Sequence, residues 1–120
     1  MSNDVTCNAV YPTLAAPNVA DTCNWYIEKL GFTLRFMWGE PATHGALLLG
    51  EACVHFWESA AQPNDNWLYF DINAVEAMYE RARENGVEIT KEPMTYPWGM
   101  REFNAVDLNG YNIRFGQYVG

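Results

Sequence analysis

The stretch DLNGYNIRF, residues 107–115, decides the fold, because it joins a turn to a strand whose two faces differ. Its first four letters are typical of a tight hairpin turn. After the turn, Ile113 and Phe115 alternate with the polar residues Asn112 and Arg114. Successive side chains of a strand point to opposite faces. The pattern therefore predicts a strand with one packed face and one polar face.

The elements that precede this strand follow one order twice. Before the midpoint, the sequence predicts an extended segment, a helix and three strands, at 8–14, 18–30, 33–38, 46–49 and 53–57. Asn18 and Gly31 are typical of the residues that begin and end a helix. After a loop-like cluster at 58–66, it predicts a strand, a helix and three strands, at 67–72, 75–85, 87–89, 100–106 and 111–118.

Two copies of a β-α-β-β-β unit predict an α+β fold. Unit one covers about residues 5–58 and unit two about 67–118, within a single domain of 120 residues. Two repeats are too few for a solenoid, so we expect them to pair around a pseudo-twofold axis. Their curved mixed sheets would then surround one cleft. The apolar pair Ile113 and Phe115 would face the helices, and Asn112 and Arg114 would face the cleft.

Composition narrows the class of protein. Apolar residues make up 49% and charged residues 18% of the chain, which is typical of a globular protein, and no apolar run is long enough to cross a membrane. The N-terminal residues lack the basic and apolar segments of a secretory signal, which predicts a cytoplasmic protein. Cys7, Cys23 and Cys53 are odd in number and lack metal-site spacing, so we expect small core residues.

The chain is acidic, with a formal net charge of -8 and a pI near 4.5. Phosphate groups would be repelled, so the charge argues against nucleic-acid binding. It favours a cationic small molecule at long range, although acidity also serves solubility alone.

Three motifs give the chain a family resemblance. They are WYIEKLGF at 25–32, YFDINAV at 69–75, and WGMREF at 98–103 followed by NGYNIRF at 109–115. They are similar to the patterns FYxxxLGF, aFeVdDv and WGxREFxxxDPDGxxxxF of the vicinal oxygen chelate superfamily. That group contains glyoxalase I, extradiol dioxygenases, fosfomycin-resistance enzymes and bleomycin-resistance proteins. The third motif most resembles the bleomycin-resistance branch.

The resemblance implies an assembly as well as a fold. Chains of that branch carry paired βαβββ units and form a homodimer by exchange of the first strand, with clefts at the subunit interface. Pro12 and Pro17 would suit a stiff connection of this kind.

The resemblance also implies four positions from which enzymes of the superfamily hold a divalent metal. In this chain they are Tyr11, His55, Trp67 and Arg114. Only His55 is a good metal ligand, and Arg114 places a fixed positive charge where a metal would lie. We therefore expect no metal, no other cofactor and no catalytic residue.

Strand parity and family position together predict a ligand-binding set that is both aromatic and polar. Trp98 would offer a flat face to a planar ligand, and Glu102 would meet a cationic group. Core packing remains an alternative for Trp57 and Trp67, as does pairing of Glu102 with Arg114. The full set is Tyr11, His55, Trp57, Trp67, Tyr69, Trp98, Met100, Glu102, Asn104 and Arg114.

Three functions fit this set. The preferred one is a non-catalytic protein that resembles bleomycin-resistance proteins and sequesters a planar, cationic, bleomycin-like ligand at a dimer interface. The second is a metal-dependent glyoxalase, dioxygenase or thiol transferase of the same superfamily that uses His55. The third is metal-free chemistry by Arg114, His55 and Glu102.

Overall fold

The computed structural model describes residues 4–120 and contains the predicted repeat. Unit one consists of β1 Thr13–Ala16, α1 Val19–Leu30, β2 Thr33–Trp38, β3 His44–Leu49 and β4 Ala52–Glu58. Unit two consists of β5 Trp67–Asp71, α2 Val75–Glu84, β6 Glu88–Thr95, β7 Met100–Val106 and β8 Asn112–Tyr118. Residues 1–3, on which part of the signal-peptide prediction rests, lie outside the described residues. Within residues 4–120, none of the helices is long and apolar enough to cross a membrane.

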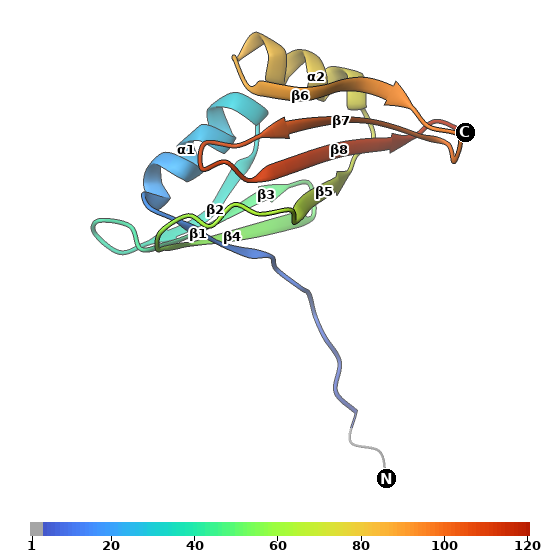
Figure 1. Ribbon diagram of the computed structural model, residues 1–120. Coiled ribbons are helices and arrows are strands. Elements are labelled where there is room, and N and C mark those ends of the chain that lie inside the picture. Colours follow the sequence, from blue (N-terminus) through green and yellow to red (C-terminus); the bar gives the residue numbers. More distant parts are fainter. Residues whose placement is uncertain (1–3) are drawn as a thin grey trace.

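Each unit forms one four-stranded mixed sheet. The strand orders are β1-β4-β3-β2 and β5-β8-β7-β6, with the first strand of each unit parallel to the last and the other pairs antiparallel. Helix α1 packs on β2, β3 and β4, helix α2 packs on β6, β7 and β8, and the two helices contact each other (Figure 1). The predicted α+β class is confirmed.

The caps of α1 agree with the sequence. The Asn18 side chain accepts a 2.9 Å hydrogen bond from the Asp21 backbone amide, which satisfies one donor at the helix start. Gly31 ends the helix in the left-handed conformation, with φ of 77°, a backbone angle that side-chain-bearing residues rarely adopt.

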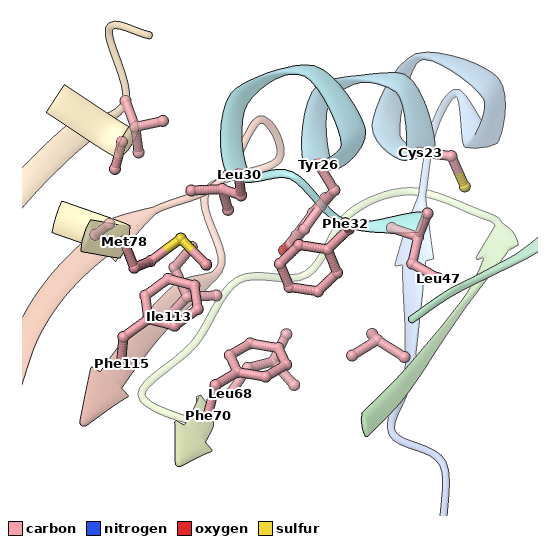
Figure 2. Close-up of a cluster of buried hydrophobic side chains, with 14 of the residues drawn as sticks. Cys23, Tyr26, Leu30, Phe32, Leu47, Leu68, Phe70, Met78, Ile113 and Phe115 are labelled. Atoms are coloured by element: carbon pink, nitrogen blue, oxygen red, sulfur yellow. The ribbon is translucent and has the colours of Figure 1, made fainter. Parts of the chain in front are cut away.

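The core lies between the helices and the two sheets and is shared by both units. Figure 2 shows Tyr26 and Phe32 of unit one beside Phe70 and Phe115 of unit two. The rings of Phe32 and Phe70 meet edge to face with centroids 5.4 Å apart, and Phe70 stacks on Phe115 at 5.3 Å. Ile113 and Phe115 are fully buried, so the predicted parity of the last strand is confirmed.

The turn between β7 and β8 joins the units, a role that the sequence did not suggest. The Tyr26 hydroxyl of α1 donates a 2.5 Å hydrogen bond to Asp107 Oδ2 in a buried environment. The Asn109 side-chain amide donates to the hydroxyl of Thr22 on α1, and the Tyr111 hydroxyl donates to the carbonyl oxygen of Ala15. The hairpin of unit two is therefore fastened to unit one by polar contacts from three side chains.

Two predicted strand boundaries were wrong by several residues, whereas the other boundaries agree to within two residues. The first strand begins at Thr13. Tyr11 and Pro12 before it still contact His55 of β4, whereas the chain nearer the N-terminus extends away from the sheets (Figure 1). Strand β6 runs on to Thr95, through Pro93. Proline is tolerated there because β6 is an edge strand and its pairing with β7 is irregular between Lys91 and Met94.

The cysteines do not all lie in the core. Cys23 and Cys53 are buried, whereas Cys7 is exposed, so the prediction is wrong for Cys7. Cys7 lies in the segment before β1, and terminal segments of a chain are seldom covered by other elements. Burial raises the pKa of the Cys23 thiol to about 11.

Candidate ligand-binding site

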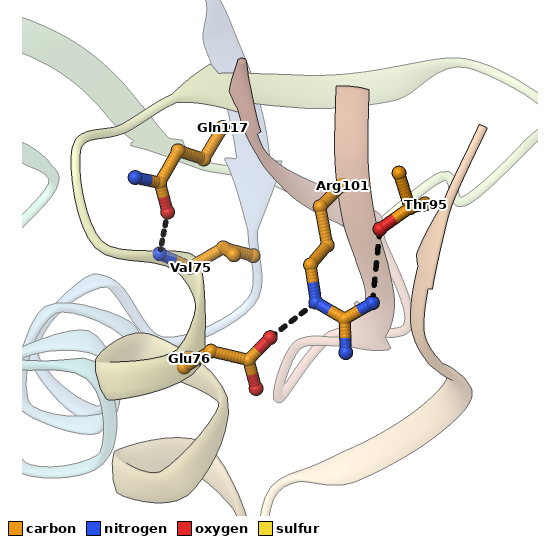
Figure 3. A network of polar contacts seen from close by, with 5 residues as sticks. All are labelled: Val75, Glu76, Thr95, Arg101 and Gln117. Carbon is orange, nitrogen blue, oxygen red and sulfur yellow. Dashed lines mark hydrogen bonds and ion pairs between the residues drawn. The ribbon is translucent and has the colours of Figure 1, made fainter. Parts of the chain in front are cut away.

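The two faces of strand β7 differ: one carries side chains that pack on α2, and the other carries candidate ligand-binding side chains. Phe103 is fully buried and its ring packs edge to face on Tyr79 of α2. Arg101, on the same face, forms an ion pair with Glu76 of α2 and donates to Thr95 of β6 (Figure 3). Alternation along the strand sends Met100, Glu102 and Asn104 to the opposite face of the sheet. We call the face of each sheet that points away from the helices its concave face.

A polar cluster lies on this concave face of unit two. The Tyr69 hydroxyl on β5 donates a 2.5 Å hydrogen bond to Glu102 Oε2 on β7, across the intervening strand β8. The bond passes over Gly116 of β8, where a Cβ atom would overlap the Tyr69 hydroxyl and lie 3.2 Å from Glu102 Cγ. The missing side chain at Gly116 therefore permits the contact.

Burial and the hydrogen bond to Glu102 raise the pKa of the Tyr69 phenol to about 12. The phenol therefore stays protonated at neutral pH and continues to donate. Glu102 itself is only 7% exposed, so its carboxylate meets protein groups more than solvent.

Arg114 on β8 is held from two sides. Its guanidinium carbon lies 4.4 Å from the centroid of the Trp67 ring, and its Nε donates a 2.8 Å hydrogen bond to Asn104 Oδ1. Its Nε is also 3.9 Å from Glu102 Oε1, an ion-pair distance that exceeds a hydrogen bond. The pairing of Glu102 with Arg114 that the sequence left open is thus present as a long ion pair.

A second cluster lies on the concave face of unit one. Tyr11 stacks on His55 of β4 with ring centroids 4.6 Å apart, and Phe36 of β2 meets the same imidazole edge to face at 5.6 Å. Arg35 donates to the Tyr11 hydroxyl at 3.1 Å and to Cys53 Sγ at 3.6 Å. His55 Nε2 is buried and has no hydrogen-bond partner within residues 4–120. Burial, and secondly the charge of Arg35, lower the pKa of His55.

Sequence reasoning missed Arg35 and Phe36. The signal was present, since Arg35 is the only charged residue in the strand TLRFMW. A register shift between Leu34 and Phe36 interrupts the alternation of β2, so parity could not assign their faces.

Two grooves run along the line where β1 faces β5, which we call the seam. One has a volume of about 490 Å³ and is lined by Trp57, Trp67 and side chains of the loop before β5. The other has a volume of about 340 Å³ and is lined by Tyr11, Cys53, Trp67 and Tyr69. Trp67 lines both grooves and so occupies the centre of the seam.

Trp98 lies elsewhere. It is 65% exposed, stacks on Tyr96 with ring centroids 4.7 Å apart, and lines neither seam groove. Gly99 beside it has φ of 94°, and a Cβ there would lie 2.7 Å from Tyr118 Cε1, so glycine is needed at this turn. Met100 is also absent from the linings of both seam grooves, as are His55, Glu102, Asn104 and Arg114, which lie on the concave faces beside the grooves.

A family model described as Glyoxalase/Bleomycin resistance protein/Dioxygenase superfamily matches residues 8–115, nearly the whole chain. The chain belongs to this superfamily. A comparison with curated protein sequences finds no match.

Solved structures from the superfamily have the same fold. TioX from Micromonospora sp. ML1 superimposes with a TM-score of 0.80 at 18% identity, covering 92% of this chain and all of TioX. A glyoxalase-related enzyme from Clostridium phytofermentans gives 0.82 at 18% identity, with 98% and 100% coverage. A mutant of the fosfomycin resistance protein FosX from Listeria monocytogenes, in complex with Mn(II) and a dihydroxypropylphosphonic acid, gives 0.72 at 16% identity, with 92% and 90% coverage. These likenesses concern the fold alone.

The superfamily includes metal enzymes, but the side chains at the predicted metal positions do not form a donor set. Tyr11 is stacked on His55, and the guanidinium of Arg114 lies over one face of the Trp67 ring. Indole and guanidinium groups are not metal ligands, and a cation at Arg114 would repel a metal ion. Among residues 4–120, no three His, Cys, Asp or Glu side chains lie together as a metal site requires.

Proposed function

We propose that this chain is a non-catalytic small-molecule binding protein that sequesters a planar ligand in the seam grooves and on the concave faces beside them. The observation that carries the proposal is the position of Trp67, an exposed indole that lines both grooves. Aromatic side chains exposed beside a groove offer flat apolar area on which a planar compound can stack. Trp57 and Tyr69, also exposed, extend this area along the seam.

The acidity of the chain favours a ligand that carries positive charge. The net charge of -8 attracts a cationic compound at long range, as in the bleomycin-like ligand that the family resemblance suggests. Sequestration requires tight binding and no reaction. The aromatic and cationic residues at the four predicted metal positions can supply stacking and charge for such binding. The chain would thus resemble bleomycin-resistance proteins in function.

The binding protein is proposed to act as a homodimer with exchange of the first strand. Large apolar side chains are exposed on the concave faces of both sheets, among them Phe36, Trp57, Trp67 and Tyr69. Such surface marks an interaction site in a soluble protein. In the single chain β1 pairs with its own β4, and exchange would form the same ladder with the β4 of a partner. A solution mass of twice 13.7 kDa supports the dimer, and a mass of 13.7 kDa overturns it.

The function is tested by titrating chelator-treated protein with bleomycin while tryptophan fluorescence is recorded. We expect saturable binding in the micromolar range or tighter. The Trp67→Leu variant should weaken binding at least about tenfold, since it removes the central stacking surface. Trp25→Leu, on helix α1 and away from the seam, is the matched control and should leave the affinity unchanged. Absence of saturation in the parent protein rejects bleomycin as a model ligand, and a screen of planar compounds that finds none rejects the function.

A further inference from the structure

The binding surface proposed above contains the guanidinium of Arg114, whose position is set by two neighbouring side chains. The Trp67 ring supports one face of it, and Asn104 accepts the hydrogen bond of its Nε. These two contacts hold the side chain in place without using its terminal nitrogens. Within residues 4–120, neither terminal nitrogen of Arg114 has a hydrogen-bond partner.

The neighbouring carboxylate does not occupy these donors. Glu102 Oε2 receives the hydrogen bond of Tyr69, and Oε1 is 3.9 Å from Nε of Arg114, on the side already bonded to Asn104. The Arg114 side chain is 32% exposed and that of Glu102 only 9%. A molecule that approaches the concave face therefore meets the guanidinium before the carboxylate.

A guanidinium with two open donors matches a planar oxyanion, because two parallel N–H groups can bond both oxygens of a carboxylate. A cationic or purely apolar group at this point would leave the donors unsatisfied when it displaced water. The indole of Trp67 and the ring of Tyr69 flank Arg114, so an aromatic ring attached to the oxyanion has a surface to pack on.

We infer that the ligand is a planar aromatic acid whose carboxylate is bound by the terminal nitrogens of Arg114. This inference rests on the proposed sequestration. Any cationic group that responds to the acidity of the chain then lies elsewhere on the same molecule. The ligand class is thus an aromatic carboxylate, zwitterionic where it also carries an amine.

The test compares two probes of equal shape, naphthalene-2-carboxylate and naphthalene-2-carboxamide, by calorimetry and by the indole signals of ¹⁵N-labelled protein. In the parent protein we expect the carboxylate to bind about tenfold more tightly than the amide, with the Trp67 signal shifted. In Arg114→Gln the ratio should fall to about one while the amide affinity stays constant. Arg114→Lys keeps the charge without the fork and should restore only part of the ratio. Arg83→Gln, on the surface of α2, is the charge-matched control and should keep the full ratio.

Each other outcome overturns the inference. Equal binding of both probes to the parent protein rejects the oxyanion and leaves sequestration of planar compounds standing. A carboxylate preference that survives in Arg114→Gln rejects Arg114 as its source. Binding of neither probe rejects the oxyanion together with the aromatic surface on which it rests. The circular dichroism of both Arg114 variants, compared with that of the parent, shows that the fold is retained.

Discussion

The hydroxyl of Tyr26 on α1 lies 2.5 Å from Oδ2 of Asp107, the first residue of the turn between β7 and β8. Asp107 Oδ1 accepts from the backbone amides of Asn109 and Tyr111, so one carboxylate both shapes the turn and fastens it to the other unit. Both side chains are buried. The hydrogen bond between Tyr26 and Asp107 connects the two units and so helps to hold their concave faces in position relative to each other.

Tyr26→Phe should therefore destabilise the whole chain. The substitution keeps the ring in the core but removes a buried donor from a carboxylate, which costs about 1–3 kcal/mol of unfolding free energy. Urea denaturation measures the loss. Tyr79→Phe is the matched control, because no hydrogen bond of the Tyr79 hydroxyl is present within residues 4–120. Equal stability of the two variants would show that the bond between Tyr26 and Asp107 contributes nothing.

The same carboxylate predicts a dependence of stability on pH. Burial raises the pKa of Asp107 above its ordinary value of 3.8, against the opposing effect of its hydrogen bonds. The folded state then holds the proton more tightly than the unfolded state. This contribution to stability is complete below pH 3.8 and is lost as the pH rises through the folded pKa.

Urea denaturation of the parent protein and of Asp107→Asn between about pH 4 and 7 tests this sign. The parent should gain stability relative to the variant as the pH falls, because only the parent has the titrating group. If the parent instead gains unfolding free energy relative to Asp107→Asn as the pH rises, the pKa of Asp107 is depressed rather than raised.

Gly116→Ala should disturb the cluster on the concave face of unit two. The new Cβ would overlap the Tyr69 hydroxyl, so the variant must break its bond to Glu102 or shift a strand, at a cost of about 1–3 kcal/mol. A double-mutant cycle with Tyr69→Ala isolates this effect. The cost of Gly116→Ala should largely vanish when Tyr69 is already truncated. An undiminished cost would place its cause in the backbone of β8.

His55 should titrate below pH 6.5, its ordinary value, since burial and Arg35 both lower its pKa. Stability linked to this imidazole is present above pH 6.5 and is lost as the pH falls through the folded pKa. Proton NMR of the imidazole gives the midpoint directly. Arg35→Gln should raise the midpoint, whereas Arg83→Gln on α2 should leave it in place. A parent midpoint at or above 6.5 would show that the site favours the charged imidazole.

Local signals in the sequence predicted the helices and the faces of the last strands. Asn18 and Gly31 mark the ends of α1 through their own backbone and side-chain chemistry, and alternation placed Phe115 in the core. The first strand was misplaced because pairing depends on a partner far along the chain. The pairing with β4 begins at Thr13, opposite His55, and the residues near Asn8 carry no sequence signal for this starting point.

The contacts within the candidate site depend on the order and register of the strands in the sheet, which local sequence patterns do not reveal. Parity placed Glu102 and Arg114 on one face, but the bond from Tyr69 to Glu102 arises only because β8 separates β5 from β7 and presents Gly116 at the crossing point. Trp98 belongs to a loop, whose conformation follows no simple periodicity. Its predicted role at the cleft mouth remains a proposal.

Sequestration without reaction is the central claim, and the fate of a bound ligand tests it most directly. Chelator-treated protein is saturated with bleomycin and separated from free ligand. The bound ligand is then released by denaturation, and its mass is measured by mass spectrometry. The account predicts about one ligand per chain, recovered with its mass unchanged. A recovered ligand of altered mass would contradict it.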